Sequence, residues 1–140
     1  EGLCGQSKKH GPTILYLFNS ADTDLLKYGI TSTSAEQRKR RSWLPGVKAI
    51  RYGELLIQPR RYSDRDQAVL IEGAYQFSYG CDSDPSLGIG WSELTDVTPE
   101  EFLARVQELE KALLEMGSWD FADEFCDPTQ VDKAKASTQR

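Results

Sequence analysis

The sequence predicts an α+β fold: a small, mostly antiparallel three-stranded sheet flanked by helices, in the order β-β-α-β-α, with an extra C-terminal helix. Two observations predict this class. Two apolar, β-branched or aromatic runs at residues 13–18 and 25–30 enclose a polar loop, and helix start signals follow them. The 140 residues fit one domain that can bury an ordinary core.

The two apolar runs indicate a β-hairpin with its loop at residues 19–24, which places Tyr16 directly opposite Lys27. Cross-strand partners share a face, with Cβ atoms about 5 Å apart. We therefore expect the ammonium to approach the phenol and to lower the pKa of Tyr16. A lysine in an apolar strand costs stability unless it has a partner or a function. Gly29, on the same face, leaves room for another group to approach the backbone closely.

A helix is expected after the hairpin, because residues 33–37 offer two alternative capping boxes, and to end near Trp43, before a Leu-Pro-Gly stop. On this helix Arg38 shares one stripe with Ala35 and Ser42. Arg38 is thus the inward-leaning member of a run of four basic residues, which continues with Lys39, Arg40 and Arg41.

A third strand is expected at residues 47–57, followed by a second helix capped by Ser63 or Asp64. The apolar face of that helix comprises Leu70, Ile71, Ala74, Tyr75 and Phe77, and Glu72 lies at its border. A short strand at 90–94 and a helix at 98–117 complete the pattern. The expected division is a flexible lead-in at 1–12, a core at 13–97, a packing helix at 98–117 and an acidic and polar tail at 118–140.

The charge is divided unequally along the chain. Residues 1–65 hold 12 Lys and Arg against 6 Asp and Glu, a balance of +6, whereas residues 66–140 hold 5 against 16, a balance of −11. The basic half suits an anionic ligand such as a phosphate backbone, and the acidic half suits a protein partner or inhibitor. Solvated charge distributed by chance is the alternative.

The three cysteines, Cys4, Cys81 and Cys126, form no disulfide or zinc pattern, which favours a reducing compartment and a cytoplasmic site of action. Cys4 and His10 are only two candidate metal ligands. No apolar run is long enough to span a membrane. The chain starts at Glu1 without a signal segment, so we expect a piece of a longer protein.

Four short fragments of the sequence fall in order on four successive expected elements. They are Leu15-Tyr16-Leu17 in the first strand, Lys27-Tyr28-Gly29 in the second, Arg38 in the first helix and Glu72 in the second. This arrangement resembles the GIY-YIG nuclease superfamily, and the K-x-G variant resembles its phage-type branch. The resemblance covers residues 13–94, including a weak match at Gly90-Trp91-Ser92-Glu93-Leu94. The first motif keeps only its tyrosine, Asp64 and Asp66 are alternative carboxylates, and a late asparagine of the family has no match.

The resemblance implies a metal-dependent endonuclease that hydrolyses phosphodiester bonds of DNA, with RNA as the alternative. Such a domain could be the toxin end of a secreted protein or a phage nuclease. It implies that Glu72 holds one Mg²⁺ or Mn²⁺ ion, that Tyr16 accepts the proton of the attacking water, that Lys27 supports that step and that Arg38 grips the phosphate. The basic residues outside these motifs are expected to contact nucleic acid: Lys39, Arg40, Arg41, Lys48, Arg60 and Arg61. Two alternatives remain open, a nucleic-acid-binding module without catalysis and an interaction domain that binds a protein through its acidic half.

Overall fold

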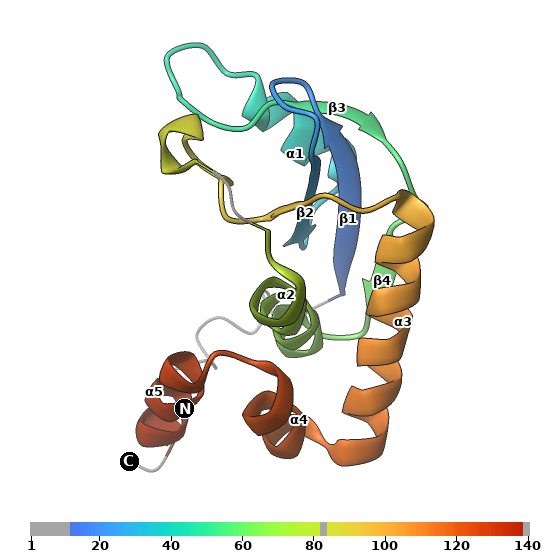
Figure 1. Cartoon of the computed structure of the whole chain (residues 1–140), viewed down its shortest axis with the longest axis vertical. Helices are drawn as coiled ribbons and strands as arrows, with labels where there is room; N and C mark the ends of the chain where they lie inside the picture. Colours follow the sequence, from blue (N-terminus) through green and yellow to red (C-terminus); the bar gives the residue numbers. More distant parts are fainter. Residues whose placement is uncertain (1–11, 82–83, 139–140) are drawn as a thin grey trace.

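The computed structural model describes residues 12–81 and 84–138, so Cys4 and His10 lie outside the described residues, as does nearly all of the predicted lead-in. It confirms an α+β fold with an antiparallel sheet (Figure 1). The predicted number of strands is wrong, because the sheet has five. Its strands are β1 (Thr13–Ser20), β2 (Leu26–Thr31), β3 (Tyr52–Leu55), β4 (Arg60–Tyr62) and β5 (Leu94–Thr95).

The order across the sheet is β3-β1-β2-β5, and β4 pairs with β1 as well. The predicted third strand at 47–57 is thus shorter than expected, and two short strands, β3 and β4, follow one another along one edge of β1. The segment before β3 forms a loop that is joined to a second loop by an isolated bridge between Ala49 and Ile89. Pro59 interrupts the hydrogen-bonding run between β3 and β4 because proline has no backbone N–H to donate.

The predicted register of the hairpin is wrong by two residues. Tyr16 lies opposite Gly29, and Lys27 lies opposite Phe18. The first strand extends further into the expected loop, so that β1 ends only at Ser20, and the Ser20 hydroxyl accepts the backbone N–H groups of Asp22 and Thr23. Because side chains alternate with a period of two, a shift of two residues leaves Tyr16 and Lys27 on the same face.

The capping signals place both early helices correctly. Helix α1 (Ala35–Ser42) begins after Ser34, whose hydroxyl accepts the backbone N–H of Gln37. Helix α2 (Arg65–Tyr79) begins after Asp64, whose carboxylate accepts the N–H of Gln67. The expected apolar face of α2 is confirmed at Ile71, Ala74 and Tyr75, whereas Phe77 is 54% exposed and does not belong to it.

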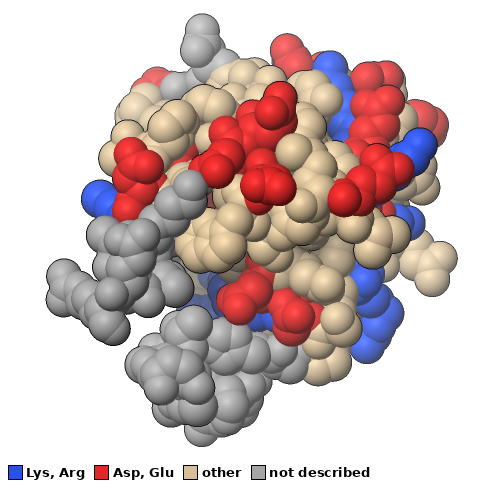
Figure 2. Space-filling model, turned by 90° about the horizontal axis from the view of Figure 1, so that it is seen from below, with Lys and Arg blue, Asp and Glu red and all other residues tan. Residues whose placement is uncertain are grey.

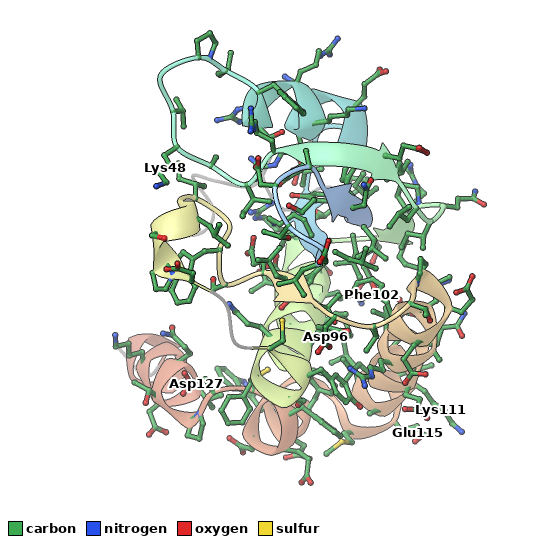
Figure 3. All side chains as sticks on the ribbon, turned by 45° about the horizontal axis from the view of Figure 1, so that its top comes forward. Lys48, Asp96, Phe102, Lys111, Glu115 and Asp127 are labelled. Carbon is green, nitrogen blue, oxygen red and sulfur yellow. The ribbon has the colours of Figure 1, made fainter. Side chains whose placement is uncertain are left out.

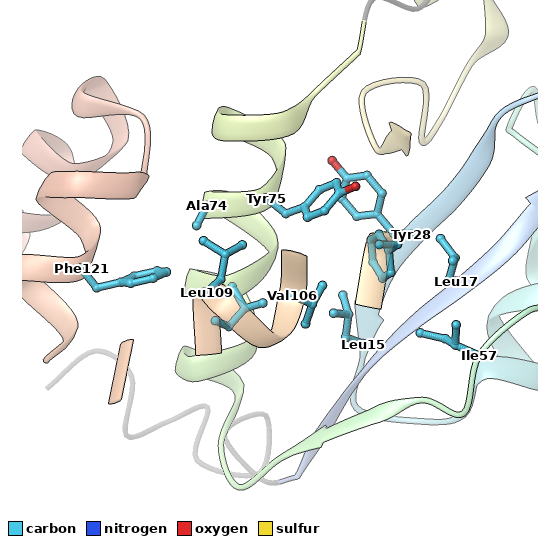
Figure 4. Packing of buried hydrophobic residues seen from close by; sticks show 11 residues of the cluster. Leu15, Leu17, Tyr28, Ile57, Ala74, Tyr75, Val106, Leu109 and Phe121 are labelled. Atoms are coloured by element: carbon cyan, nitrogen blue, oxygen red, sulfur yellow. The ribbon is translucent and has the colours of Figure 1, made fainter. Parts of the chain in front are cut away.

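The C-terminal part contains three helices, α3 (Pro99–Met116), α4 (Ser118–Phe125) and α5 (Pro128–Thr138), where one helix and a tail were expected. The predicted start at Thr98 and end at Gly117 of α3 are confirmed. Phe121 of α4 is fully buried in the main core, together with Val106 and Leu109 of α3 (Figure 4). The acidic segment is therefore folded onto the domain, because its aromatic side chain can be buried there.

The sheet separates two groups of buried side chains. Leu15, Leu17 and Tyr28 point toward α2, α3 and α4 and form the main core. Tyr16 and Phe18 point to the opposite face, where they pack with Tyr52 under α1. Figure 1 places α1 and β3 at one end of the molecule and α4 and α5 at the other. Figure 2 looks at the end with α4, where Asp and Glu side chains are scattered over the surface. No helix of the described residues is long and apolar enough to cross a membrane.

Candidate active site

A cluster of polar side chains lies on the face of the sheet beneath α1. The Tyr16 hydroxyl is 3.0 Å from the Tyr52 hydroxyl, and Arg38 Nε donates to the Tyr16 oxygen at 3.4 Å. Arg38 is half-buried, whereas Ala35 and Ser42 on the same stripe of α1 are buried. The prediction that Arg38 leans inward is therefore confirmed, and it joins α1 to the strand tyrosines.

Lys27 lies in the same cluster and is buried, with only 1% of its side chain exposed. Its Nζ donates to the backbone oxygen of Tyr28 and, at 2.8 Å, to Oε1 of Glu93. The Nζ atom also lies 5.8 Å from the ring centroid of Tyr16 and 5.4 Å from that of Tyr52. A buried ammonium is tolerated only when it is paired and hydrogen-bonded, and these contacts meet that requirement.

Two glycines make room for these side chains. A Cβ atom at Gly29 would lie 2.4 Å from the Tyr16 hydroxyl oxygen, and one at Gly90 would lie 2.7 Å from Cε of Lys27. Gly90 also has a φ of 93°, a backbone conformation that residues other than glycine rarely adopt. The expectation that Gly29 permits a close approach is thus confirmed, and the group that approaches is the phenol of the facing strand.

Substituting Gly29 with alanine is expected to displace the Tyr16 hydroxyl and to lower the free energy of unfolding by about 1 to 3 kcal/mol, because the added methyl group overpacks the cluster. Urea unfolding followed by tyrosine and tryptophan fluorescence measures the change. The matched control is Gly73→Ala in α2, where an added Cβ meets nothing within 4 Å and where alanine favours the helix. Equal stability of both variants would contradict the contact between Gly29 and Tyr16.

The predicted lowering of the Tyr16 pKa is wrong. Tyr16 is fully buried, and burial raises the pKa of its phenol above the usual value of 10, with Tyr52 raising it further. Arg38 acts in the opposite direction but more weakly. Since an apolar surrounding disfavours the phenolate, Tyr16 stays a neutral hydroxyl near neutral pH.

Glu72 reaches this cluster through a second carboxylate. The pKa of Glu72 is raised from its usual 4.5 to about 8, chiefly by burial and then by the adjacent Glu93 carboxyl, while Lys27 has a weaker, opposite effect. Glu93 therefore joins the two groups, since it contacts both Glu72 and Lys27. No three His, Cys, Asp or Glu side chains of the described part of the chain gather into a metal-binding group.

A depression of about 210 Å³ opens over the cluster. Its floor and basic side are formed by Lys27, Arg38, Arg41, Tyr52 and Glu93. Tyr16 and Glu72 do not line it, although each interacts with a residue that does, Tyr16 with Tyr52 and Glu72 with Glu93. The four residues named by the sequence are therefore connected, but only Lys27 and Arg38 face the opening.

The residues expected to contact nucleic acid do not share one surface. Arg40, Arg41, Lys48 and Arg61 are exposed, and Lys39 is half-buried. Arg60 is not free for a ligand, because it is paired with Glu110 of α3 and faces the main core side, as does its strand partner Leu15. Arg61 pairs with Ile14 and so belongs to the face of the candidate site.

Sequence reasoning missed Tyr52 and Glu93 as members of the site. Tyr52 was included only in an expected strand, and Glu93 only in a weak closing motif. Both lie far along the chain from Tyr16, and only the pairing of β3 with β1 and of β5 with β2 brings them close. A tyrosine in a short strand and a glutamate in a turn carry no local signal of such a role.

Comparison of the chain with protein-family models, with curated proteins and with solved structures found no match.

Proposed function

We propose that this protein is a metal-dependent endonuclease of the GIY-YIG type that hydrolyses phosphodiester bonds of DNA. One observation carries the proposal. Side chains from four separate elements, β1, β2, α1 and α2, are connected through contacts at one end of the sheet, and they are the residues Tyr16, Lys27, Arg38 and Glu72 that the motifs single out. A purely structural network does not require this combination of a buried lysine, a half-buried arginine and two adjacent carboxyls.

The donor set fits a divalent cation. Glu72 and Glu93 place two carboxyl groups against each other, which is unfavourable when both are ionised and becomes favourable when a cation lies between them. Glu72 would hold Mg²⁺ or Mn²⁺ together with an oxygen of Glu93. A divalent cation supplies charge neutralisation at the phosphate and lowers the pKa of water, so that a strong protein base is not required.

The remaining side chains then have distinct roles. Arg38 binds non-bridging phosphate oxygens through its guanidinium fork, and Arg41 at the rim adds a second cation. Lys27, fixed by Glu93, adds a positive charge at the floor where negative charge develops. Tyr52 orients the attacking water with its hydroxyl, and Tyr16 holds Tyr52 in place as a neutral phenol. This replaces the role of proton acceptor that the resemblance implies for Tyr16.

Incubation with supercoiled plasmid DNA and Mg²⁺ or Mn²⁺ is expected to yield nicked and linear DNA, and EDTA is expected to prevent it. Glu72→Ala and Arg38→Ala should each slow cleavage by roughly 100-fold or more, because each removes a charge that acts on the transition state. The matched controls are Glu36→Ala and Arg40→Ala, which replace two exposed residues of α1, the helix that carries Arg38. Cleavage that survives both site substitutions would contradict the site, and binding without cleavage under either metal would favour a catalytically silent module.

The positions of the arginines predict which of them contribute to DNA binding. Arg41→Ala is expected to weaken binding and to reduce the slope of log K against log[salt] by about 1, because one phosphate contact is lost. Arg60→Ala is expected to leave binding unchanged and to lower stability by about 1 kcal/mol, since its partner is Glu110. Fluorescence anisotropy titrations at several salt concentrations measure both. Equal losses of affinity in the two variants would contradict the placement of the DNA over α1.

A further inference from the structure

Part of the wall of the candidate active site is apolar. Leu44, Val47 and Ile89 line the same depression as Arg38 and Arg41, and they are respectively 53%, 48% and 66% exposed. We name these three side chains the aliphatic rim. Single exposed apolar residues are ordinary on a protein surface, but three around one charged depression indicate a ligand with both an apolar and an anionic part.

The rim is held in place by backbone contacts between its two loops. The Ile89 N–H donates to the Lys48 oxygen at 3.0 Å, and the Ile89 oxygen accepts the Ile50 N–H at 2.9 Å. Ile50 is buried, so the backbone at Ile89 is anchored while its side chain points outward. Figure 3 shows Lys48 beside the short helix η2 (Pro85–Leu87), on the side of the molecule where these loops meet. Because both the N–H and the oxygen of Ile89 are hydrogen-bonded, the Ile89 backbone is fixed with its side chain directed away from the core.

Charge complementarity identifies the occupant. The rim adjoins Arg38 and Arg41, and Lys48 extends the positive charge along the loop that carries Val47. A depression of about 210 Å³ is smaller than the roughly 300–1,000 Å³ of a typical ligand site, which suits a single base beside a phosphate. Aliphatic side chains contact bases when a base step is opened, and such wedges partly unstack nucleic acid. In an intact duplex the base faces are stacked and cannot reach the rim.

We propose that the aliphatic rim binds an unstacked nucleobase next to the phosphate held by Arg38, so that the substrate is single-stranded or locally opened DNA. This inference rests on the proposed function and specifies its substrate class. It also makes the rim a determinant of substrate choice that is separate from the groups that act on the phosphate. Removing the rim therefore reduces the preference for unpaired substrate, while phosphate binding by the arginines continues.

The test uses the full chain and oligonucleotides that contain 2-aminopurine, a fluorescent adenine analogue that is quenched when stacked. In EDTA, binding of the single strand is expected to raise its fluorescence and to be at least tenfold tighter than binding of the matched duplex. The triple variant L44S/V47S/I89S should lose the fluorescence rise and bind the single strand about tenfold more weakly. The control V69S/F77S/L114S removes comparably exposed apolar side chains from α2 and α3. Thermal melting checks that both variants fold.

The outcomes separate this inference from the proposed function. Unchanged 2-aminopurine fluorescence, or equal binding by wild type and rim variant, overturns the inference even if plasmid DNA is cleaved. A fluorescence rise that depends on the rim, without cleavage under Mg²⁺ or Mn²⁺, supports the inference as a binding property and overturns the catalytic function. A dimer in sedimentation that disappears in the rim variant, with no effect on DNA, would assign the rim to a second copy of the chain and overturn the inference.

Discussion

Replacing Glu72 with glutamine is expected to stabilise the metal-free protein at alkaline pH while it abolishes cleavage. In EDTA at pH 9 the free energy of unfolding should rise by about 2 to 3 kcal/mol over wild type, whereas at pH 5 the two proteins should differ little. A residue that costs stability in the free protein and is required for activity is typical of a binding or catalytic group.

The sign follows from the pKa of Glu72, which is about 8 in the folded protein and 4.5 as the usual value. Between these values the unfolded chain has lost the proton and the folded chain has kept it, so wild-type stability falls as the pH rises from about 4.5 through 8. Above pH 8 both states are ionised, and the folded state carries two adjacent carboxylates, Glu72 and Glu93. Glutamine has no charge to lose, and its amide can donate a hydrogen bond to Glu93.

Urea unfolding at pH 5 and pH 9, with and without millimolar Mg²⁺, measures both parts of this prediction. Wild type should gain stability with the cation at pH 9, and Glu72→Gln should gain little. Glu108→Gln, an exposed residue of α3, is the control for loss of one charge. A loss of stability in Glu72→Gln that is equal at both pH values would show that Glu72 only supports the fold and would contradict its assignment to the cation.

Replacing Arg38 with lysine is expected to slow cleavage by roughly 100-fold or more and to leave DNA affinity almost unchanged. Lysine keeps the positive charge, so the counterion release that drives binding persists. It cannot present two parallel donors to a phosphate, and it cannot keep the Nε contact with the Tyr16 hydroxyl while it does so. The substitution conserves the positive charge but loses the geometry of the guanidinium fork, so it weakens stabilisation of the transition state more than binding of the ground state.

Single-turnover cleavage separates the rate of the chemical step from affinity, which anisotropy measures in EDTA. Arg40→Lys, on the exposed side of α1, is the control and should behave as wild type in both experiments. Equal, small effects of Arg38→Lys and Arg40→Lys would contradict a bidentate role. A loss of affinity without a loss of rate would assign Arg38 to DNA attraction alone.

The starts of α1, α2 and α3 could be predicted because they depend on local chemistry, whereas α4 and α5 were missed. Ser34, Asp64 and Thr98 cap α1, α2 and α3, respectively. Each side chain accepts a hydrogen bond from the backbone N–H three residues later, so the contact depends only on nearby sequence. The strands were predicted less well. The hairpin register was wrong because strand pairing depends on where a turn closes, and β4 was missed because three residues beside a proline carry little pattern.

The candidate site could be predicted only in part for the same reason. The face shared by Tyr16 and Lys27 follows from the two-residue period of strands, so it survived the error in register. The partners of these residues are Tyr52, in β3 at one edge of the sheet, and Glu93, in the turn just before β5 at the other edge, and no local pattern relates them. The pKa of Tyr16 was predicted in the wrong direction because its burial depends on α1 and β3, which lie far along the chain.

The sequence by itself determined the α+β class, the starts of α1, α2 and α3, the segregation of charge and the common face of Tyr16 and Lys27. Each of these depends on local hydrogen bonding, on residue spacing or on counting. Only the tertiary structure decided that Lys27 is paired with Glu93 and that Tyr16 is buried and neutral. It also decided that Arg60 is paired with Glu110 of α3, and that three aliphatic side chains border the depression. These properties depend on desolvation and on contacts between distant segments, which exist only once the chain has folded.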